Sequence, residues 1–205
     1  MDVLSEDFYA ARERDLQKRL KPSRFTHVQG VAQTAQELAH IYGVDERKAH
    51  LAGLLHDWDK NYNDEEIRAR ALDLGLDVDD YVLEKLPALL HGPTAAEALG
   101  REWPEIPADV LQAISRHTTG AVDMSDLDMV LYVADAIEPS RIYGDLDELR
   151  DLVGKVELEE LFFRTFQHVF LMLVGRGKCM DPQTAVIWNH YVARARERAG
   201  KGGEA

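Results

Sequence analysis

Apolar residues recur at intervals of three and four along most of the 205-residue chain, which is the spacing of one face of an α-helix. We predict a helix over residues 25–42 that ends at Gly43, because glycine tolerates the left-handed conformation that terminates many helices. Asp45 is positioned to cap a second helix, which runs through Leu55 towards residues 56 and 57. The stripe of the first helix comprises Val28, Val31, Ala32, Ala35, Leu38, Ala39 and Tyr42.

The same helical pattern continues beyond residue 60. In the last patterned segment, Asp181 is expected to cap the helix, with Pro182 at its first position. No alternating run is long enough to predict a β-strand, and no segment repeats at a fixed period. We therefore predict an all-α fold, a helical bundle with one domain over residues 1–199 and a disordered tail at 200–205. The further predicted helices span residues 65–75, 80–90, 94–103, 107–117, 127–137, 158–174 and 182–199.

Composition limits the chemistry that this domain can carry. Its only cysteine, Cys179, can form neither an internal disulfide nor a cysteine-based zinc site, which indicates a reducing compartment. The longest apolar run, residues 169–174, is too short to cross a bilayer, and the first twenty residues lack a signal-peptide core. We expect a cytoplasmic protein with no membrane partner. A formal net charge of -13 disfavours a nucleic-acid duplex as partner and leaves small anionic ligands as candidates.

The segment GLLHDWDK, residues 53–60, places His56 and Asp57 directly after an apolar run. A buried carboxylate is costly unless it is paired, hydrogen-bonded or bound to a metal. Three other histidines, His27, His91 and His117, also lie at the ends or on the apolar faces of predicted helices. Each one alone is more often a hydrogen-bonded core histidine, but together they point to a shared centre.

The residues that follow His91 are expected to interrupt the chain's helical structure. Gly92 and Pro93 come directly after it, and both residues are poor helix formers. We therefore expect His91 to end one helix, with the next helix beginning at Thr94.

Asp135 is the single charge in the apolar stretch MVLYVADAI, residues 129–137. It could pair with a helix N-terminus or with a buried arginine, and Arg141 is close enough in sequence to be that arginine. Alternatively it is a metal ligand, which accounts for the histidines as well. Together with His27, His56 and Asp57 it offers mixed nitrogen and oxygen donors, which suit iron, manganese or zinc. We favour the metal site.

The order H, HD, H, H, D resembles that of the HD-domain metal-dependent phosphohydrolases. Three stretches narrow the resemblance: HVQGVAQTAQELAHIYGVDERKAHLAGLLHDWDK, AISRHTTG and MSDLDMVLYVADAIEPSR. They are similar to the YqeK branch, whose members hydrolyse diadenosine tetraphosphate symmetrically to two ADP. The resemblance covers about residues 20–190 and implies an HD-domain helical bundle.

The resemblance also implies roles for individual residues. It implies one or two ions, iron or else manganese or another divalent metal, with the first held by His27, His56, Asp57 and Asp135. His91 and His117 would face the phosphates or complete a second metal position. Nucleotide contacts are expected from Lys60, which is also a catalytic candidate, and from Thr118, Arg141 and Lys178.

Two positions depart from the family pattern. The loop has Cys179, Met180, Asp181 and Pro182 where an isoleucine, a histidine and a proline are expected, which puts base or ribose contacts there in doubt. Asp59 stands between the HD pair and Lys60, where a small residue is usual. We expect Asp59 to be a solvated carboxylate at a helix end.

The expected chemistry follows from these groups. A metal bound by imidazoles and carboxylates lowers the pKa of a bound water towards neutrality, and Lys60 and Arg141 can contact the polyphosphate. The expected partner is a small dinucleoside polyphosphate, and the sequence is compatible with a homodimer. Another HD-type nucleotide phosphohydrolase, or a nucleotide sensor without turnover, are the alternatives. The complete ligand set favours an enzyme over the sensor.

Overall fold

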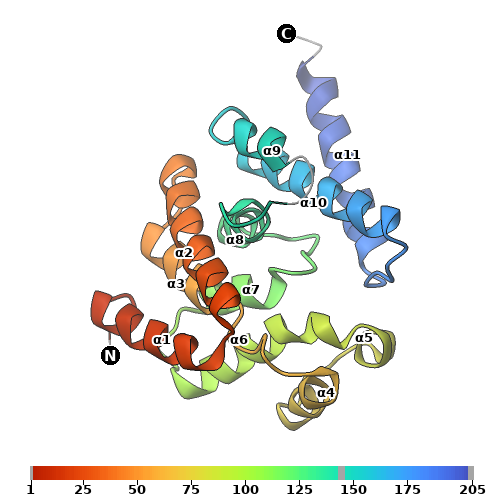
Figure 1. Cartoon of the computed structure of the whole chain (residues 1–205). Coiled ribbons are helices and arrows are strands. Elements are labelled where there is room, and N and C mark those ends of the chain that lie inside the picture. The colour runs from red at the N-terminus through yellow and green to blue at the C-terminus, as the bar shows by residue number, and fades with distance from the viewer. Residues whose placement is uncertain (1, 143–145, 203–205) are drawn as a thin grey trace.

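A computed structural model describes residues 2–142 and 146–202 of the chain (Figure 1). Within these ranges the structure contains helices and no strand, so the all-α prediction is confirmed. No helix in this part of the chain is long and apolar enough to cross a membrane. The elements are α1 (Glu6–Arg19), α2 (Pro22–Tyr42), α3 (Glu46–Leu55), α4 (Asp64–Asp73), α5 (Asp80–Lys85), the 3-10 helix η1 (Pro87–Leu90), α6 (His91–Glu102), α7 (Ala108–Arg116), α8 (Asp126–Ile137), α9 (Leu146–Leu152), α10 (Leu158–Gly175) and α11 (Thr184–Gly202).

Helix α8 forms the centre of the bundle. Nearly every one of its residues is buried, as expected for a helix that is apolar on all sides. It packs against α2, α3 and α7 and, on another side, against α9 and α10. Figure 1 shows α8 nearly end-on among these helices. Asp135 therefore lies on the element that most of the core surrounds.

Two glycines allow helix pairs to approach closely. A Cβ atom at Gly53 of α3 would lie 2.7 Å from the Cα of Ala32 in α2. At Gly92 of α6, a Cβ atom would lie 2.9 Å from the carbonyl oxygen of Ile114 in α7. Side chains at these positions would separate each pair. The first pair brings His27 towards His56, and the second brings His91 towards His117.

The helix ends match the sequence in part. Gly43 ends α2 with a φ of 72°, and the Asp45 side chain accepts hydrogen bonds from the first turn of α3, as predicted. The predicted helix 80–90 is wrong: it is divided at Leu86, because the residue before a proline is disfavoured in the α conformation.

The expected interruption after His91 is also wrong, because α6 begins at His91 and contains Gly92 and Pro93. Proline is tolerated there because the first-turn N–H groups of a helix have no intrahelical acceptor.

Three differences concern the less apolar parts of the chain. Helices α1 and α9 were not predicted, since α1 buries only Phe8, Tyr9 and Leu16 and its stripe is weak. Helix α11 begins at Thr184 rather than Pro182, after a turn in which the Asp181 side chain accepts from the Gln183 N–H. It continues to Gly202, so residues 200–202 of the expected tail are helical, and 203–205 lie outside the described residues.

Candidate metal centre

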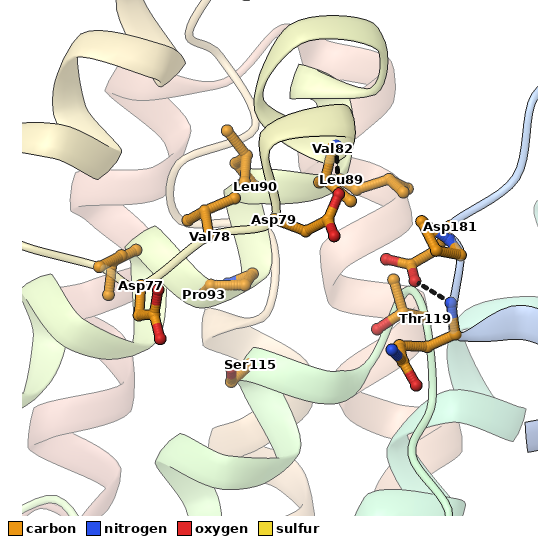
Figure 2. Close-up of a pocket in the computed structure, with 13 residues that line it drawn as sticks. Asp77, Val78, Asp79, Val82, Leu89, Leu90, Pro93, Ser115, Thr119 and Asp181 are labelled. Atoms are coloured by element: carbon orange, nitrogen blue, oxygen red, sulfur yellow. Dashed lines mark hydrogen bonds between the residues drawn. The ribbon is translucent and has the colours of Figure 1, made fainter. Parts of the chain in front are cut away.

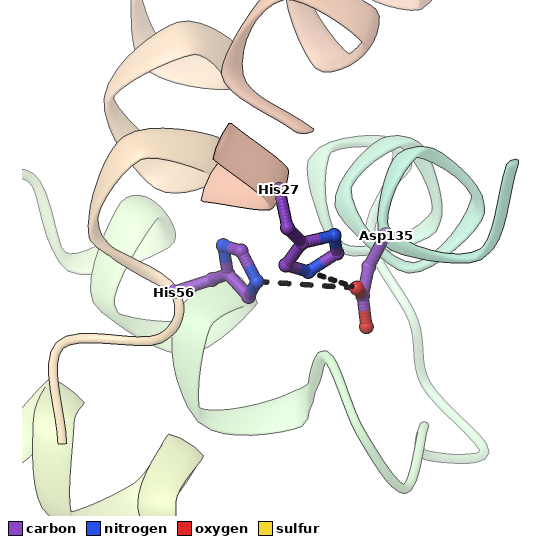
Figure 3. Close-up of side chains that lie close together, drawn as sticks. All are labelled: His27, His56 and Asp135. Atoms are coloured by element: carbon purple, nitrogen blue, oxygen red, sulfur yellow. Dashed lines mark ion pairs between the residues drawn. The ribbon is translucent and has the colours of Figure 1, made fainter. Parts of the chain in front are cut away.

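The four residues expected to hold a metal lie close together, and Figure 3 shows three of them, His27, His56 and Asp135. His27 lies on α2, His56 and Asp57 directly follow α3, and Asp135 lies on α8. The Nε2 atom of His27 is 3.0 Å from Oδ1 of Asp135, and that of His56 is 3.4 Å from Oδ2 of Asp57. His27, His56 and Asp135 offer ligand atoms that all lie within 4.8 Å of one another.

Three of the imidazoles are oriented by their own helix ends. His56, His91 and His117 each follow the last residue of a helix and donate Nδ1–H to the carbonyl oxygen three residues earlier, at 2.7 Å. Because a carbonyl oxygen can only accept, the Nδ1 atom of each ring carries a proton, and Nε2, the nitrogen that can bind a metal in a neutral ring, faces the centre. Each ring is therefore oriented by a hydrogen bond within its own stretch of sequence.

The centre contains buried nitrogen atoms that a cation would satisfy. Nε2 of His56 is fully buried and has no hydrogen-bond partner, which is costly for a polar atom. The Nε2 atoms of His91 and His117 are 3.0 Å apart, so two lone pairs face each other. His56, Asp57 and His117 form a second group of ligand atoms within 4.8 Å. These donors fit one divalent ion, or two that share Asp57, whose Oδ2 lies 3.4 Å from Nε2 of His56 and whose Oδ1 lies 3.2 Å from Nε2 of His91.

Electrostatics favours ionised carboxylates and a neutral His117 at the centre. For His56, burial lowers the pKa, but Asp57 and Asp135 more than offset this and raise it. Burial raises the pKa of Asp57, but His56 and His91 more than offset this and hold it well below its usual value. Burial likewise opposes ionisation of Asp135, yet His27, His56 and Arg141 lower its pKa strongly. Burial, together with His91 and His56, lowers the pKa of His117 to about 3. Two carboxylates are therefore ionised and His117 is neutral at pH 7.

A turn after α8 brings the Arg141 side chain back to the centre. Pro139 ends the helix, and the Arg141 N–H donates to the Glu138 carbonyl at 3.0 Å, closing a turn. The Arg141 guanidinium reaches Oδ1 of Asp135 at 2.7 Å. Asp135 thus contacts both His27 and an arginine, so the two interpretations of this residue from the sequence are compatible.

Glu138 is a site residue that sequence reasoning missed. Its carboxylate is 1% exposed and accepts from Nδ1 of His27 at 2.9 Å. The Ser140 N–H and hydroxyl also donate to it, at 2.7 and 2.5 Å. This carboxylate fixes the ring of His27, which lacks the helix-end carbonyl that orients the other three histidines. The signal in the sequence is its position three residues after Asp135, on the same helical face.

Glu138→Gln is expected to weaken divalent-metal binding about 10-fold, because partners that orient metal ligands typically contribute 10- to 100-fold to affinity. Calorimetric titration with Mn²⁺ would measure the dissociation constant. Glu97→Gln is a matched control, since that carboxylate is 41% exposed and pairs with Arg101 at the surface. An unchanged dissociation constant for Glu138→Gln would exclude the orienting role.

Arg24 was also missed. It lies three residues before His27 on α2, and its Nη1 donates to Oδ2 of Asp57 at 3.0 Å. The spacing alone put Arg24 on the same helical face as His27. Its guanidinium partly neutralises Asp57 from the side of the centre where α2 begins.

The predicted nucleotide-contacting residues are distributed unevenly. Nζ of Lys60 is 3.3 Å from Nε2 of His91, and Oγ1 of Thr118 is 3.0 Å from Nε2 of His117. Burial lowers the pKa of Lys60, against the opposing effect of Asp57. Lys178 is exposed in the loop between α10 and α11 and is not among the described residues that contact the centre. Lys60, Thr118 and Arg141 therefore border the centre, and Lys178 does not.

The prediction that Asp59 is a solvated carboxylate is wrong. It is fully buried rather than solvated, and it pairs with Arg70 of α4 through two contacts of 2.6 and 3.1 Å. Arg19 lies at 3.6 Å as a second cation. The preceding Trp58 is also buried and packs edge-on against Trp103. The ion pair of Asp59 and the packing of Trp58 hold the loop that carries Asp57 and Lys60.

Two pockets lie on the Thr118 side of the centre. A pocket of about 370 Å³ is bordered by Thr119 and by the carboxylates of Asp77, Asp79 and Asp181 (Figure 2). A smaller one, of about 90 Å³, shares Thr119 and Asp181 and has mainly apolar walls, including Phe170. Cys179 and Met180 line the smaller pocket, so the residues that depart from the family pattern do face a cavity beside Thr118.

Comparison with known proteins identifies the family. The model of the HD domain matches residues 24–140, more than half of the chain, and this range contains all six histidine and aspartate residues of the centre. The chain belongs to the HD-domain family. Membership implies a divalent-metal site, and the groups described above fit one.

Named relatives and a solved structure extend this result. The chain is 32% identical over 178 residues to the symmetrical bis(5'-nucleosyl)-tetraphosphatase of Bacillus subtilis (strain 168), covering 87% of this chain and 94% of that one. It is 33% identical over 184 residues to the protein of the same name from Staphylococcus aureus (strain NCTC 8325 / PS 47), covering 87% and 92%. A predicted HD superfamily hydrolase involved in NAD metabolism from Clostridium acetobutylicum has 33% identity and a TM-score of 0.83, covering 91% of this chain and 97% of that one. The YqeK-branch resemblance is therefore confirmed.

Proposed function

We propose that this HD-domain protein is a metal-dependent hydrolase that cleaves diadenosine tetraphosphate symmetrically into two ADP. The observation that carries the proposal is the convergence of four Nε2 atoms and two carboxylates in a chain that closely resembles symmetrical tetraphosphatases. The metal we propose is iron, as the family resemblance implies, with manganese or another divalent ion as substitute. Imidazole and carboxylate donors suit these ions. We further propose a cytoplasmic location and a small-molecule partner.

His27, His56, Asp57 and Asp135 are the proposed ligands of the first ion, with His91 and His117 completing a second position or facing phosphate. When bound, the metal acidifies water and neutralises charge on the phosphoryl oxygens. Arg141, which is held against Asp135, donates to the phosphates from one side of the centre. Lys60 and Thr118, which also border the centre, donate to the phosphates as well, and the partly buried Lys60 ammonium gains an anionic partner.

Hydrolysis in oxygen-18 water tests the reaction directly. The metal-loaded protein is expected to convert diadenosine tetraphosphate into two ADP, with one oxygen-18 atom shared between the two products. That result follows if water adds to one of the two central phosphorus atoms, and mass spectrometry of the products measures it. AMP with ATP would contradict the proposed cleavage position. Binding without turnover with iron, manganese and other divalent ions would favour the sensor.

A further inference from the structure

A third pocket beside the centre differs from the other two in charge. It has a volume of about 390 Å³ and lies between the start of α2 and the loop after Asp57. Lys21, Arg24 and Lys60 line it, with Asn61 and Tyr62, and its described lining contains no carboxylate. This gathering of cations opposes the formal net charge of -13 of the chain. We call it the cationic pocket.

The cationic pocket adjoins the candidate metal centre directly. Arg24 contacts Asp57 at 3.0 Å, and Lys60 contacts His91 at 3.3 Å, so two of the three cations touch residues of the centre. The Arg24 side chain is 34% exposed and Lys21 is exposed, which leaves the pocket open to solvent. An anionic chain bound at the centre can therefore extend into this pocket.

The two pockets on the Thr118 side do not suit a polyphosphate. Their described linings contain no lysine, arginine or histidine, and Asp77, Asp79 and Asp181 make the larger one acidic. Phosphates placed among these carboxylates would be repelled, whereas a base can pack on the apolar walls of the smaller pocket. The side of the centre with the cationic pocket therefore favours phosphate, and the Thr118 side favours a base.

We propose that the cationic pocket binds the phosphates of the departing nucleotide, while the retained nucleotide lies on the Thr118 side. This inference rests on the proposed function. The two halves of the substrate are identical, so asymmetry of the protein must select which half leaves. Water adds to one central phosphorus and releases a proton to solvent, the bridging P–O bond breaks, and the bridging oxygen leaves with the other ADP and gains negative charge. Lys21, Arg24 and Lys60 stabilise that charge as it develops.

Lys21 offers the sharpest test, because it lines the pocket without contacting a candidate ligand. In Lys21→Glu, kcat/KM for diadenosine tetraphosphate is expected to fall about 10-fold, and in Lys21→Gln about 3-fold, as for loss of nearby charge at a partly solvated site. The salt dependence of kcat/KM should weaken in both variants. Metal content should stay unchanged. Lys155→Glu is the matched control, since it makes the same charge change at an exposed position outside the pocket.

Inorganic pyrophosphate separates this inference from the proposed function. It lacks a base and so reports phosphate binding alone, and calorimetry should show weaker binding to the metal-loaded Lys21→Glu variant than to Lys155→Glu. If the wild-type protein does not cleave the dinucleotide, the proposed function fails, and the pyrophosphate comparison still decides whether the pocket binds phosphate. If Lys21→Glu and Lys155→Glu behave alike in both kinetics and pyrophosphate binding, the cationic pocket has no such role.

Discussion

Asp57→Asn is expected to lower bound metal to a small fraction of the wild-type content and to reduce hydrolysis by at least about 100-fold. The reason is that metal-based charge stabilisation supplies several kcal/mol, and about 1.4 kcal/mol corresponds to a factor of ten in rate. Asp57 is 1% exposed, and its oxygens lie 3.2 Å from His91 and 3.4 Å from His56. Asparagine keeps the shape of the side chain but removes the negative charge that a bound metal ion requires and that faces His56 and His91. Elemental analysis of anaerobically purified protein, with a rate assay, measures both effects.

The control for this variant is Asp123→Asn, which removes the same charge from a side chain that is 71% exposed. It should retain wild-type metal content and rate. Circular dichroism should show the helical signal unchanged in both variants, because α2, α3 and α8 pack through apolar contacts. Full activity with unchanged metal content in Asp57→Asn would remove this residue from the proposed centre.

Arg70→Met is expected to destabilise the folded protein by about 2 to 4 kcal/mol, because removing one partner of a buried ion pair leaves an uncompensated charge. Asp59 is fully buried and depends on Arg70 for two hydrogen bonds, while Arg19 at 3.6 Å provides weaker compensation. The melting temperature should fall by about 5 to 15 °C for a domain of this size. Urea denaturation of metal-free protein measures the free energy of unfolding without the contribution of a bound ion.

Arg164→Met provides the comparison. Arg164 pairs with Glu160 one turn away on α10, both side chains are more than 40% exposed, and such pairs contribute about 0.3 to 0.5 kcal/mol. A loss in Arg70→Met no larger than in Arg164→Met would mean that Asp59 reaches solvent after all. Because Asp59 lies between Asp57 and Lys60, we also expect Arg70→Met to impair activity through the loop that carries them.

Much of the helical fold was predictable because helix formation follows local periodicity and end signals. The stripe from Val28 to Tyr42 with its terminal Gly43 predicted α2, and the apolar stretch around Asp135 predicted α8. Predictions were weakest where that signal is ambiguous, as at His91, where Gly92 and Pro93 occur within the first turn of α6. There the position within the helix decides whether proline is tolerated.

The candidate site likewise has features that follow from local sequence and others that depend on how the helices pack. The sequence by itself predicted the candidate donors. It also determined a local feature, the carbonyl three residues before His56, His91 and His117 that accepts from each ring at a helix end. Only the tertiary structure decided which groups face one another: the carboxylate of Glu138 meets His27 from 111 residues away, and Asp59 pairs with Arg70 instead of water. The state of a charged side chain depends on its neighbours in space, and helix packing, not sequence spacing, determines which neighbours it has.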